Sequence, residues 1–376
     1  MKLKIGIVFG GCSREREISF AGGRTVYDNL NKSLFEAIPL FIDSFGNFIE
    51  LDWKYIYKGS IRDFYPPVSF LKESPHQFQV YAECIAFENE NEANKMAQEI
   101  GKIISPSALK NKIDFAFLCL HGPYGEDGTI QGLLDFYGIP YSGSGIYPSA
   151  VGINKIIQKQ LMSEANFNCP NYITIHKDEW YPANRKSIFE KALALVNFPM
   201  VIKAPTQGSS IGISILKENS FEQFCEAINK SLFRIEFKAN DWLGLEDQQK
   251  VDKVRQWADI REGIGMPVQI QFSKTGSSLE NKIVHHPEDL LIALNAINDN
   301  ALEVLIEALD GENEVLVEQF IKGKEFSCIV VEHFVNGKKE VLALPPTEIR
   351  KGQDLFDYRS KYLPGLARKI TPIDLP

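Results

Sequence analysis

The chain has 376 residues and a net charge of −8 at pH 7, with 24% charged residues. This length allows two or three domains with a large core, and the composition is that of a soluble globular protein. The acidic balance argues against a nucleic-acid-binding protein, which would carry a basic excess.

The cysteines and the N-terminus indicate the compartment. The six cysteines are scattered without a CxxC pair, and Cys12, Cys119 and Cys328 lie in or beside apolar runs. We therefore expect reduced, buried thiols. No stretch has the length of a membrane span, and the apolar part of the N-terminus is too short for a signal peptide, so we expect a cytoplasmic protein without a membrane partner.

The first part of the chain alternates strands with helices. Residues 4–9 (KIGIVF) are continuously apolar, which predicts a strand buried on both faces of a parallel sheet. A glycine-rich turn and a helical pattern over 19–30 follow. Residues 114–120 predict a second buried strand, before a glycine-rich loop and a helix over 129–138. This alternation predicts an α/β domain over residues 1–150.

The later part of the chain has a different sequence pattern, which predicts both helices and strands. We expect helices over 153–166, 219–232, 250–263 and 286–297, strands within 198–216 and over 266–272, and three strands within 314–345. Asn336-Gly337 predicts the hairpin turn between the last two strands. The charged region 233–300 is therefore expected to be structured rather than a linker.

The first glycine-rich turn, FGGCSRE, does not match the fingerprint of a dinucleotide-binding loop. It lacks GxGxxG, and the next strand-like run offers only a loosely placed Asp43 as the required acid. A nicotinamide site is disfavoured. The alternatives are a tight turn in which Ser13 caps a helix, and a solvated pair formed by Glu15 and Arg16.

The loop HGPYGEDGTIQG starts at His121 and carries acids rather than lysines, so it is a poor phosphate cradle. Its glycines suit a wall against which a small polar substrate lies. His121 ends a buried strand, where ligands bind in open α/β sheets, but it could equally be a structural histidine. Glu126 and Asp127 could simply cap the following helix.

Residues 203–212 (KAPTQGSSIG) form the better phosphate candidate. Flexible backbone amides, two serine hydroxyls and Lys203 are the usual elements of an anion cradle, although an ordinary polar hairpin fits as well. Further on, Glu318 and Glu325 flank a glycine-bearing turn. They could accept hydrogen bonds from adenine and ribose, or they could be exposed strand charges.

The stretch FDYRSKY places Lys361 and Tyr362 side by side. A lysine there could pair with phosphate, and a tyrosine could hold a serine hydroxyl.

Taken in order, these segments closely resemble the D-alanine–D-alanine ligase family of the ATP-grasp superfamily. The matching blocks are FGGCSREREIS, LHGPYGEDGTIQG, PYSGSG, GINKIIQK, VIKAPTQGSSIG, VEQFIKGKEF and FDYRSKY, within residues 1–230 and 312–376. The resemblance implies an α/β ATP-grasp architecture. Its expected parts are an N-terminal Rossmann-like substrate domain (1–150), a lid subdomain (151–322) with an insert at about 233–300, and the start of a C-terminal subdomain (323–376).

The resemblance also implies a reaction and its residues. Two D-alanine molecules would be joined at the expense of ATP, through an acyl-phosphate intermediate and with Mg²⁺ or Mn²⁺. The product would serve peptidoglycan precursor synthesis. The protein would be a homodimer, and no nucleic-acid partner is expected. Glu15 and His121 would bind the first D-alanine, and Glu15, Ser209 and Tyr362 would form a catalytic hydrogen-bonded link. The implied ATP-binding residues are Lys155, Lys203, Ser210, Glu318, Gln319, Phe320, Ile321, Glu325 and Lys361.

Two departures from the family leave alternatives open. The family's metal-binding acids and asparagine are expected beyond Pro376, so no metal ligand is assigned, and Glu92–Asn94 is expected to be surface. A non-catalytic ATP-binding fragment is therefore one alternative, and a D-alanyl-D-lactate or D-alanyl-D-serine ligase is another. The second departure is the insert at about 233–300, to which no function is assigned; an interaction surface or a cover on the lid would both suit it.

Overall fold

The structure is a computed structural model that describes residues 2–87, 89–274, 277–351 and 367–374. The N-terminal part is built on a five-stranded sheet of order β4-β3-β2-β1-β5. Strand β1 (Leu3–Gly10) pairs in parallel with β2 (Phe35–Ile42) and β5 (Phe115–Leu118), and β3 (Phe48–Leu51) and β4 (Gly101–Ile104) extend it antiparallel. The strand expected at 4–9 is confirmed as a buried parallel strand, and the one expected at 114–120 is present as β5, but it is only partly buried, with Phe117 exposed.

Helices cover both faces of this sheet, because its apolar runs leave two faces to bury. They are α1 (Arg16–Asn29), α2 (Glu90–Gln98), α3 (Pro106–Lys112) and α4 (Thr129–Tyr137). The link from β3 to α2 contains short 3₁₀ helices at Trp53–Tyr55, Ile61–Asp63, Val68–Phe70 and Ala82–Cys84.

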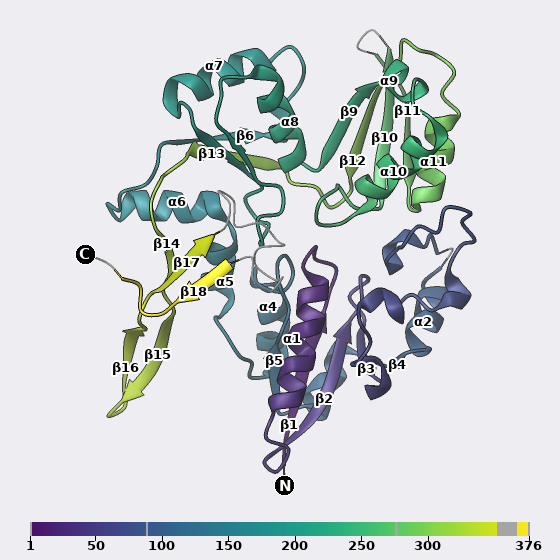
Figure 1. Cartoon of the computed structure of the whole chain (residues 1–376). Helices are drawn as coiled ribbons and strands as arrows, with labels where there is room; N and C mark the ends of the chain where they lie inside the picture. The colour runs from purple at the N-terminus through teal and green to yellow at the C-terminus, as the bar shows by residue number, and fades with distance from the viewer. Residues whose placement is uncertain (1, 88, 275–276, 352–366, 375–376) are drawn as a thin grey trace.

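A second, antiparallel sheet of order β6-β13-β7-β8 lies above the first (Figure 1). Its strands are β6 (Tyr172–His176), β13 (Glu314–Gln319), β7 (Met200–Lys203) and β8 (Ser214–Leu216), and α7 (Arg185–Leu195) and α8 (Phe221–Ser231) pack on it. Helices α5 (Ile146–Ile153) and α6 (Lys155–Glu164) lead into this sheet, with a 3₁₀ turn at Lys177–Glu179 after β6. Asn154 caps α6 by accepting from two backbone amides.

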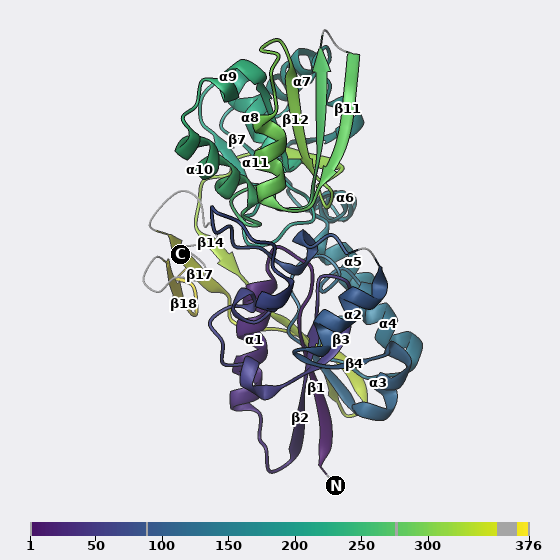
Figure 2. The same cartoon turned by 90° about the vertical axis from the view of Figure 1, so that its right-hand side faces the viewer.

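The expected insert is a folded unit with its own antiparallel sheet of order β11-β10-β12-β9. Its strands are β9 (Arg234–Lys238), β10 (Val268–Lys274), β11 (Ser277–Val284) and β12 (Glu303–Ala308), and its helices are α9 (Ala239–Leu243), α10 (Asp247–Ala258) and α11 (Pro287–Asn295). The expectation of a structured region is confirmed, and its sheet continues to Ala308, past residue 300. In both views the insert lies above the N-terminal sheet (Figures 1 and 2).

The last part forms a three-stranded sheet of β14 (Glu325–Ser327), β17 (Thr347–Lys351) and β18 (Ala367–Ile370), and a hairpin of β15 (Val330–Val335) and β16 (Lys338–Ala343). Asn336 and Gly337 have φ of 51° and 77°, so the expected hairpin turn is confirmed.

The cysteine expectation is only partly right. Cys119 is buried, Cys12 is partly exposed and Cys328 is exposed. The expectation for Cys328 is wrong because its apolar neighbours belong to the β15–β16 hairpin, whose two-stranded sheet stands apart from the other sheets (Figure 1). Within the described ranges, no helix is both long and apolar enough to span a bilayer.

Candidate active site

Three consecutive charged residues stand where β1 passes into α1, and all are buried. Arg14, Glu15 and Arg16 are 3%, 5% and 3% exposed. Arg16 forms an ion pair of 2.6 Å with Glu83 and donates to the Ser13 carbonyl at 2.8 Å. The interpretation of Glu15 and Arg16 as a solvated pair is therefore wrong. Ser13 does not cap the helix either, because Glu15 occupies the cap position and Ser13 Oγ accepts from the Glu15 N–H.

The Glu15 carboxylate meets the glycine–serine loop between β7 and β8. Its Oε1 accepts a hydrogen bond from the Ser209 hydroxyl. Gly208 is required here, since a Cβ on it would lie 2.1 Å from Glu15 Oε2, and a Cβ on Gly122 (φ +71°) would lie 3.4 Å from the same atom. The two glycine-rich segments of the sequence thus close around one carboxylate. No ion pair joins Glu15 to a cationic side chain in the described part of the chain.

Two charged residues, Lys155 and Glu312, form hydrogen bonds with the glycine–serine loop. Lys155 donates from Nζ to the carbonyls of Pro205 and Gln207, at 3.2 and 2.6 Å. Glu312, just before β13, accepts from the Thr206 hydroxyl at 2.6 Å and from the Gln207 amide at 3.2 Å. Burial raises the pKa of Glu312, although these donors oppose the rise. Sequence reasoning missed Glu312, which lies in an ordinary charged turn.

The loop at His121 is closed by its own acids. Glu126 accepts from the Gly122 N–H at 2.7 Å, and Asp127 accepts from the N–H groups of Tyr124 and Thr129, at 2.7 and 2.9 Å. Asp127 thus binds the first N–H group of α4, although Gly128 holds the cap position, and Glu126 binds its own loop; the simpler interpretation is right only in part. His121 Nδ1 lies 3.9 Å from Glu126 Oε1, at the end of the β5 strand.

A cavity of about 1460 Å³ lies between the β7–β8 and β13 strands and the sheet of β14 and β17. Its walls combine apolar and charged side chains, which suits a ligand with a flat ring and a charged tail. The expected ATP residues that line it are Lys203, Ser210, Glu318, Gln319, Phe320, Ile321 and Glu325. Lys155 is not among the lining residues, and Lys361 and Tyr362 lie outside the described residues.

Glu318 is the buried charge of this cavity. It is 6% exposed and pairs with Lys203 through Oε1 and with Lys159, at 2.5 Å, through Oε2. Burial alone would raise the pKa of Glu318, but Lys203 and Lys159 together hold it below its usual value. The alternative of an exposed strand charge is wrong for Glu318, whereas Glu325 is exposed at the cavity.

Sequence reasoning missed six charged lining residues, which are Lys159, Lys217, Lys322, Lys324, Glu348 and Arg350. Lys159 carried a usable signal, because it follows Lys155 by four residues and thus lies on the same face of α6. In the described ranges, no group of three or more His, Cys, Asp or Glu side chains is placed to hold a metal ion.

Comparison with solved structures defines the class. The VanG D-Ala:D-Ser ligase of Enterococcus faecalis superposes with a TM-score of 0.52 at 21% identity, over 99% of this chain and 76% of that one. The D-alanyl-alanine synthetase A of Vibrio cholerae gives a TM-score of 0.50 at 18% identity, over 98% and 74% of the two chains. The chain therefore has the α/β architecture of the ATP-grasp ligases, as expected.

Sequence comparison defines the family. The family model for the D-ala D-ala ligase N-terminus matches residues 4–144, and the model for the C-terminus matches 161–238 and 232–376. The D-alanine–D-alanine ligase of Caldicellulosiruptor bescii is 25% identical over 375 residues, 100% of this chain and 74% of that protein. The one of Desulforamulus reducens is 26% identical over 376 residues, 100% of this chain and 75% of that protein. The chain belongs to the D-alanine–D-alanine ligase family.

Proposed function

We propose that the protein joins two D-alanine molecules to D-alanyl-D-alanine, with conversion of ATP to ADP and phosphate, for peptidoglycan precursor synthesis. The observation that carries this proposal is Glu15, which is 5% exposed and hydrogen-bonded to Ser209, without an ion pair to any cationic side chain in the described ranges. A buried carboxylate is costly without a positive partner. The ammonium group of an amino acid would supply that partner.

The two neighbouring spaces fit the two kinds of substrate. Gly122 and Gly208 bring backbone close to the Glu15 carboxylate, which suits a ligand as small as an amino-acid zwitterion. The large cavity is lined by Lys203 and Ser210 and by Phe320 and Ile321. We assign ATP to this cavity, with its phosphates toward Lys203 and Ser210.

The residue roles follow from these positions. Glu15 and His121 would hold the first D-alanine, and Ser209 would fix the Glu15 carboxylate. Lys155 would order the loop whose amides, with Ser210 and Lys203, face the phosphates. Gln319, Phe320 and Ile321 would contact adenine, and Glu325 would accept from the ribose. Lys361 and Tyr362 keep their proposed phosphate and serine contacts.

Glu318 requires a more specific role than adenine recognition alone. Its carboxylate is paired with Lys159 and Lys203, so it sets where these two ammonium groups lie. Lys203 would exchange part of its interaction with Glu318 for a phosphate oxygen when ATP binds.

The chemistry needs an activated carboxylate and a dry site. A carboxylate oxygen of the first D-alanine attacks the γ-phosphorus of ATP, ADP leaves, and an acyl phosphate forms. The neutral amine of the second D-alanine attacks its carbonyl carbon, and phosphate leaves from the tetrahedral intermediate. Lysine charge and oriented amide donors stabilise the transferring phosphoryl group and the oxyanion. A loop closed over Glu15 excludes water from the acyl phosphate.

The divalent cation in this family's reaction neutralises charge on the phosphates of ATP, and we assign no residue to it. Because ATP and amino-acid substrates are supplied inside the cell, we place the reaction in the cytoplasm. A homodimer is part of the same proposal.

The test is release of phosphate from ATP and Mg²⁺ by the 376-residue chain, with and without D-alanine. We expect release that depends on D-alanine, with D-alanyl-D-alanine identified by mass spectrometry and with D-serine and D-lactate as poorer second substrates. Glu15→Gln removes the negative charge and should abolish the D-alanine dependence. Release that ignores D-alanine, or ATP binding without turnover, would contradict the proposal.

A further inference from the structure

Arg14, the residue before Glu15, reaches out of the N-terminal domain into the insert. Its guanidinium donates to the carbonyls of Ile260 and Ile264, at 3.0 and 2.8 Å, and forms an ion pair of 2.8 Å with Asp310. The side chain is 3% exposed. The backbone on the N-terminal side of Glu15 is thus held by partners that belong to the insert and its exit.

The loop that carries Ser209, the hydrogen-bond partner of Glu15, is packed against the insert as well. The Phe233 ring, just before β9, lies 3.8 Å from the Arg14 guanidinium carbon. A Cβ on Gly212 would lie 3.2 Å from the same ring, and Ile211 is buried in the hydrophobic core to which Phe233 belongs. One aromatic side chain therefore contacts both the Arg14 segment and the loop that carries Ser209.

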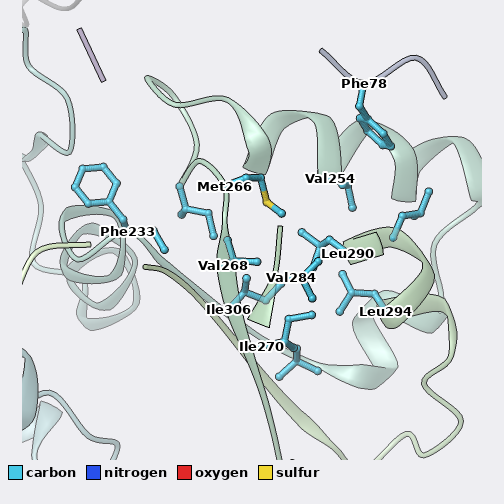
Figure 3. Packing of buried hydrophobic residues seen from close by; sticks show 14 of the residues in the cluster. Phe78, Phe233, Val254, Met266, Val268, Ile270, Val284, Leu290, Leu294 and Ile306 are labelled. Atoms are coloured by element: carbon cyan, nitrogen blue, oxygen red, sulfur yellow. The ribbon is translucent and has the colours of Figure 1, made fainter. Parts of the chain in front are cut away.

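The insert is also fixed to the N-terminal domain at a distance from the site. Glu288 at the start of α11 accepts from Ser74 Oγ at 2.6 Å and lies 3.0 Å from His76 Nδ1. Phe78 and Val80 belong to the hydrophobic core of the insert, and Figure 3 shows Phe78 above Val254. In the chain, the insert follows α8 and precedes β13, so both of its ends are joined to the β6-β13-β7-β8 sheet. It nevertheless packs on the N-terminal domain.

We propose that the insert positions Glu15 for the first amino acid, and that Arg14 is the positioning residue through which it acts. Arg14 and Glu15 are consecutive, so movement of the Arg14 backbone moves the Glu15 carboxylate. Phe233 supports the loop on the other side, so the insert sets the separation between Glu15 and Ser209. This inference rests on the role proposed above for Glu15 and adds a residue and a segment to it.

The test compares Arg14→Ala and Arg14→Lys with the full-length wild type. We expect Arg14→Ala to raise KM for the first D-alanine about 10- to 100-fold, because small displacements of a positioning group have effects of that order. Binding of ATP should weaken by a smaller factor than binding of D-alanine, since Lys203 and Glu318, which line the cavity, belong to β7 and β13 rather than to the loop. Arg14→Lys keeps the charge but cannot reach both carbonyls and Asp310, so it should rescue only partly.

A second readout does not depend on turnover. In amide hydrogen exchange, Arg14→Ala should speed exchange in residues 11–18 and 205–212 together, about tenfold, while β1 and β5 keep their protection. Arg24→Ala is the matched control, because Arg24 lies on α1, the helix that follows Arg14, and donates to the Lys58 carbonyl at 3.0 Å, away from Glu15. It should change neither readout.

Asp310→Asn guards against a variant that fails to fold, because the Asp310 side chain is 60% exposed. It should raise KM for D-alanine in the same direction by a smaller factor. Unchanged KM and unchanged exchange in Arg14→Ala would overturn the inference while leaving the ligase proposal intact. If the wild type itself shows no D-alanine-dependent turnover, the ligase proposal fails, and the exchange experiment still decides whether Arg14 couples the two segments.

Discussion

The ammonium group of Lys159 lies 2.5 Å from Oε2 of Glu318, so this carboxylate is shared between Lys159 and Lys203. Both lysines line the cavity assigned to ATP. We expect Lys159→Ala to weaken ATP binding about tenfold, or about 1.4 kcal/mol. Without Lys159, Glu318 attracts Lys203 alone, and Lys203 is less available to a phosphate. Calorimetric titration with ATP measures the change.

Lys186→Ala is the charge-matched control, because Lys186 is an exposed lysine on α7 outside the cavity. Equal affinities for wild type and Lys159→Ala would show that Glu318 does not divide its charge between the two lysines.

The same carboxylate predicts a dependence of stability on pH. The pKa of Glu318 is held below its usual value, so its ion pairs contribute fully above about pH 4.3 and are lost as pH falls through the lowered pKa. Glu318→Gln should lower the free energy of unfolding by about 3 kcal/mol at pH 7, the lower end for breaking a buried pair. Urea unfolding from pH 3 to pH 7 should show this difference shrinking below pH 4. A difference that stays constant with pH would mean that the charge of Glu318 is not what stabilises the fold.

Gly208 should tolerate no side chain. A Cβ there would lie 2.1 Å from Glu15 Oε2, so Gly208→Ala must push the loop away from Glu15. We expect kcat/KM for D-alanine to fall at least about 100-fold. ATP binding, followed by calorimetry, should weaken by a much smaller factor, because Lys203 and Glu318 on β7 and β13 keep their places even though Ser210 belongs to the displaced loop.

Gly152→Ala is its control. No atom lies within 4 Å of a Cβ at that helical position, so stability should stay within about 1 kcal/mol of the wild type and activity should be unchanged. An active Gly208→Ala enzyme would show that the loop does not need to approach Glu15.

Glu312 should stabilise the glycine–serine loop. Glu312→Ala leaves the donors of Thr206 and Gln207 without their acceptor, at a cost of about 1–3 kcal/mol in the free energy of unfolding. Thermal and urea unfolding measure it.

Glu312→Gln separates the acceptor from the charge. The amide oxygen can keep the hydrogen bonds, so the loss seen with alanine should not occur. Since burial raises the pKa of Glu312, wild-type stability should decrease as pH rises through that raised pKa, and the glutamine variant should lack this decrease. A glutamine variant as unstable as the alanine variant would assign the effect to the charge instead.

Secondary-structure elements that depend on neighbouring residues in the chain are predictable from the sequence. The apolar run before Gly10, the Pro287 start of α11 and the Asn336-Gly337 turn each depend on neighbouring residues, and the structure has them where expected. The sequence also groups Lys203, Ser210 and residues 318–321 as short blocks at the ends of β7 and β13, and the structure brings them together around one cavity, whose binding of ATP stays a proposal.

The contacts between distant segments were not predictable from the sequence. Arg14 and Arg16 look alike in the sequence, yet one binds carbonyls about 250 positions away and the other pairs with Glu83. Backbone carbonyls such as those of Ile260 and Ile264 carry no signature in a sequence. The prediction that Cys328 is buried is wrong for a related reason. An apolar run indicates which side chains of a strand can be buried, but it does not indicate whether another element covers them.

The hydrophobic core of the insert has a consequence for protein engineering. It takes in Phe78 and Val80 from the N-terminal domain and Ile211 from the loop beside Glu15. Excision of residues 234–308 to obtain a shorter chain would expose these side chains to water and remove the two carbonyls, of Ile260 and Ile264, that Arg14 binds. A minimised enzyme would therefore need polar replacements at Phe78 and Val80 and a small residue at Arg14, designed together with the deletion.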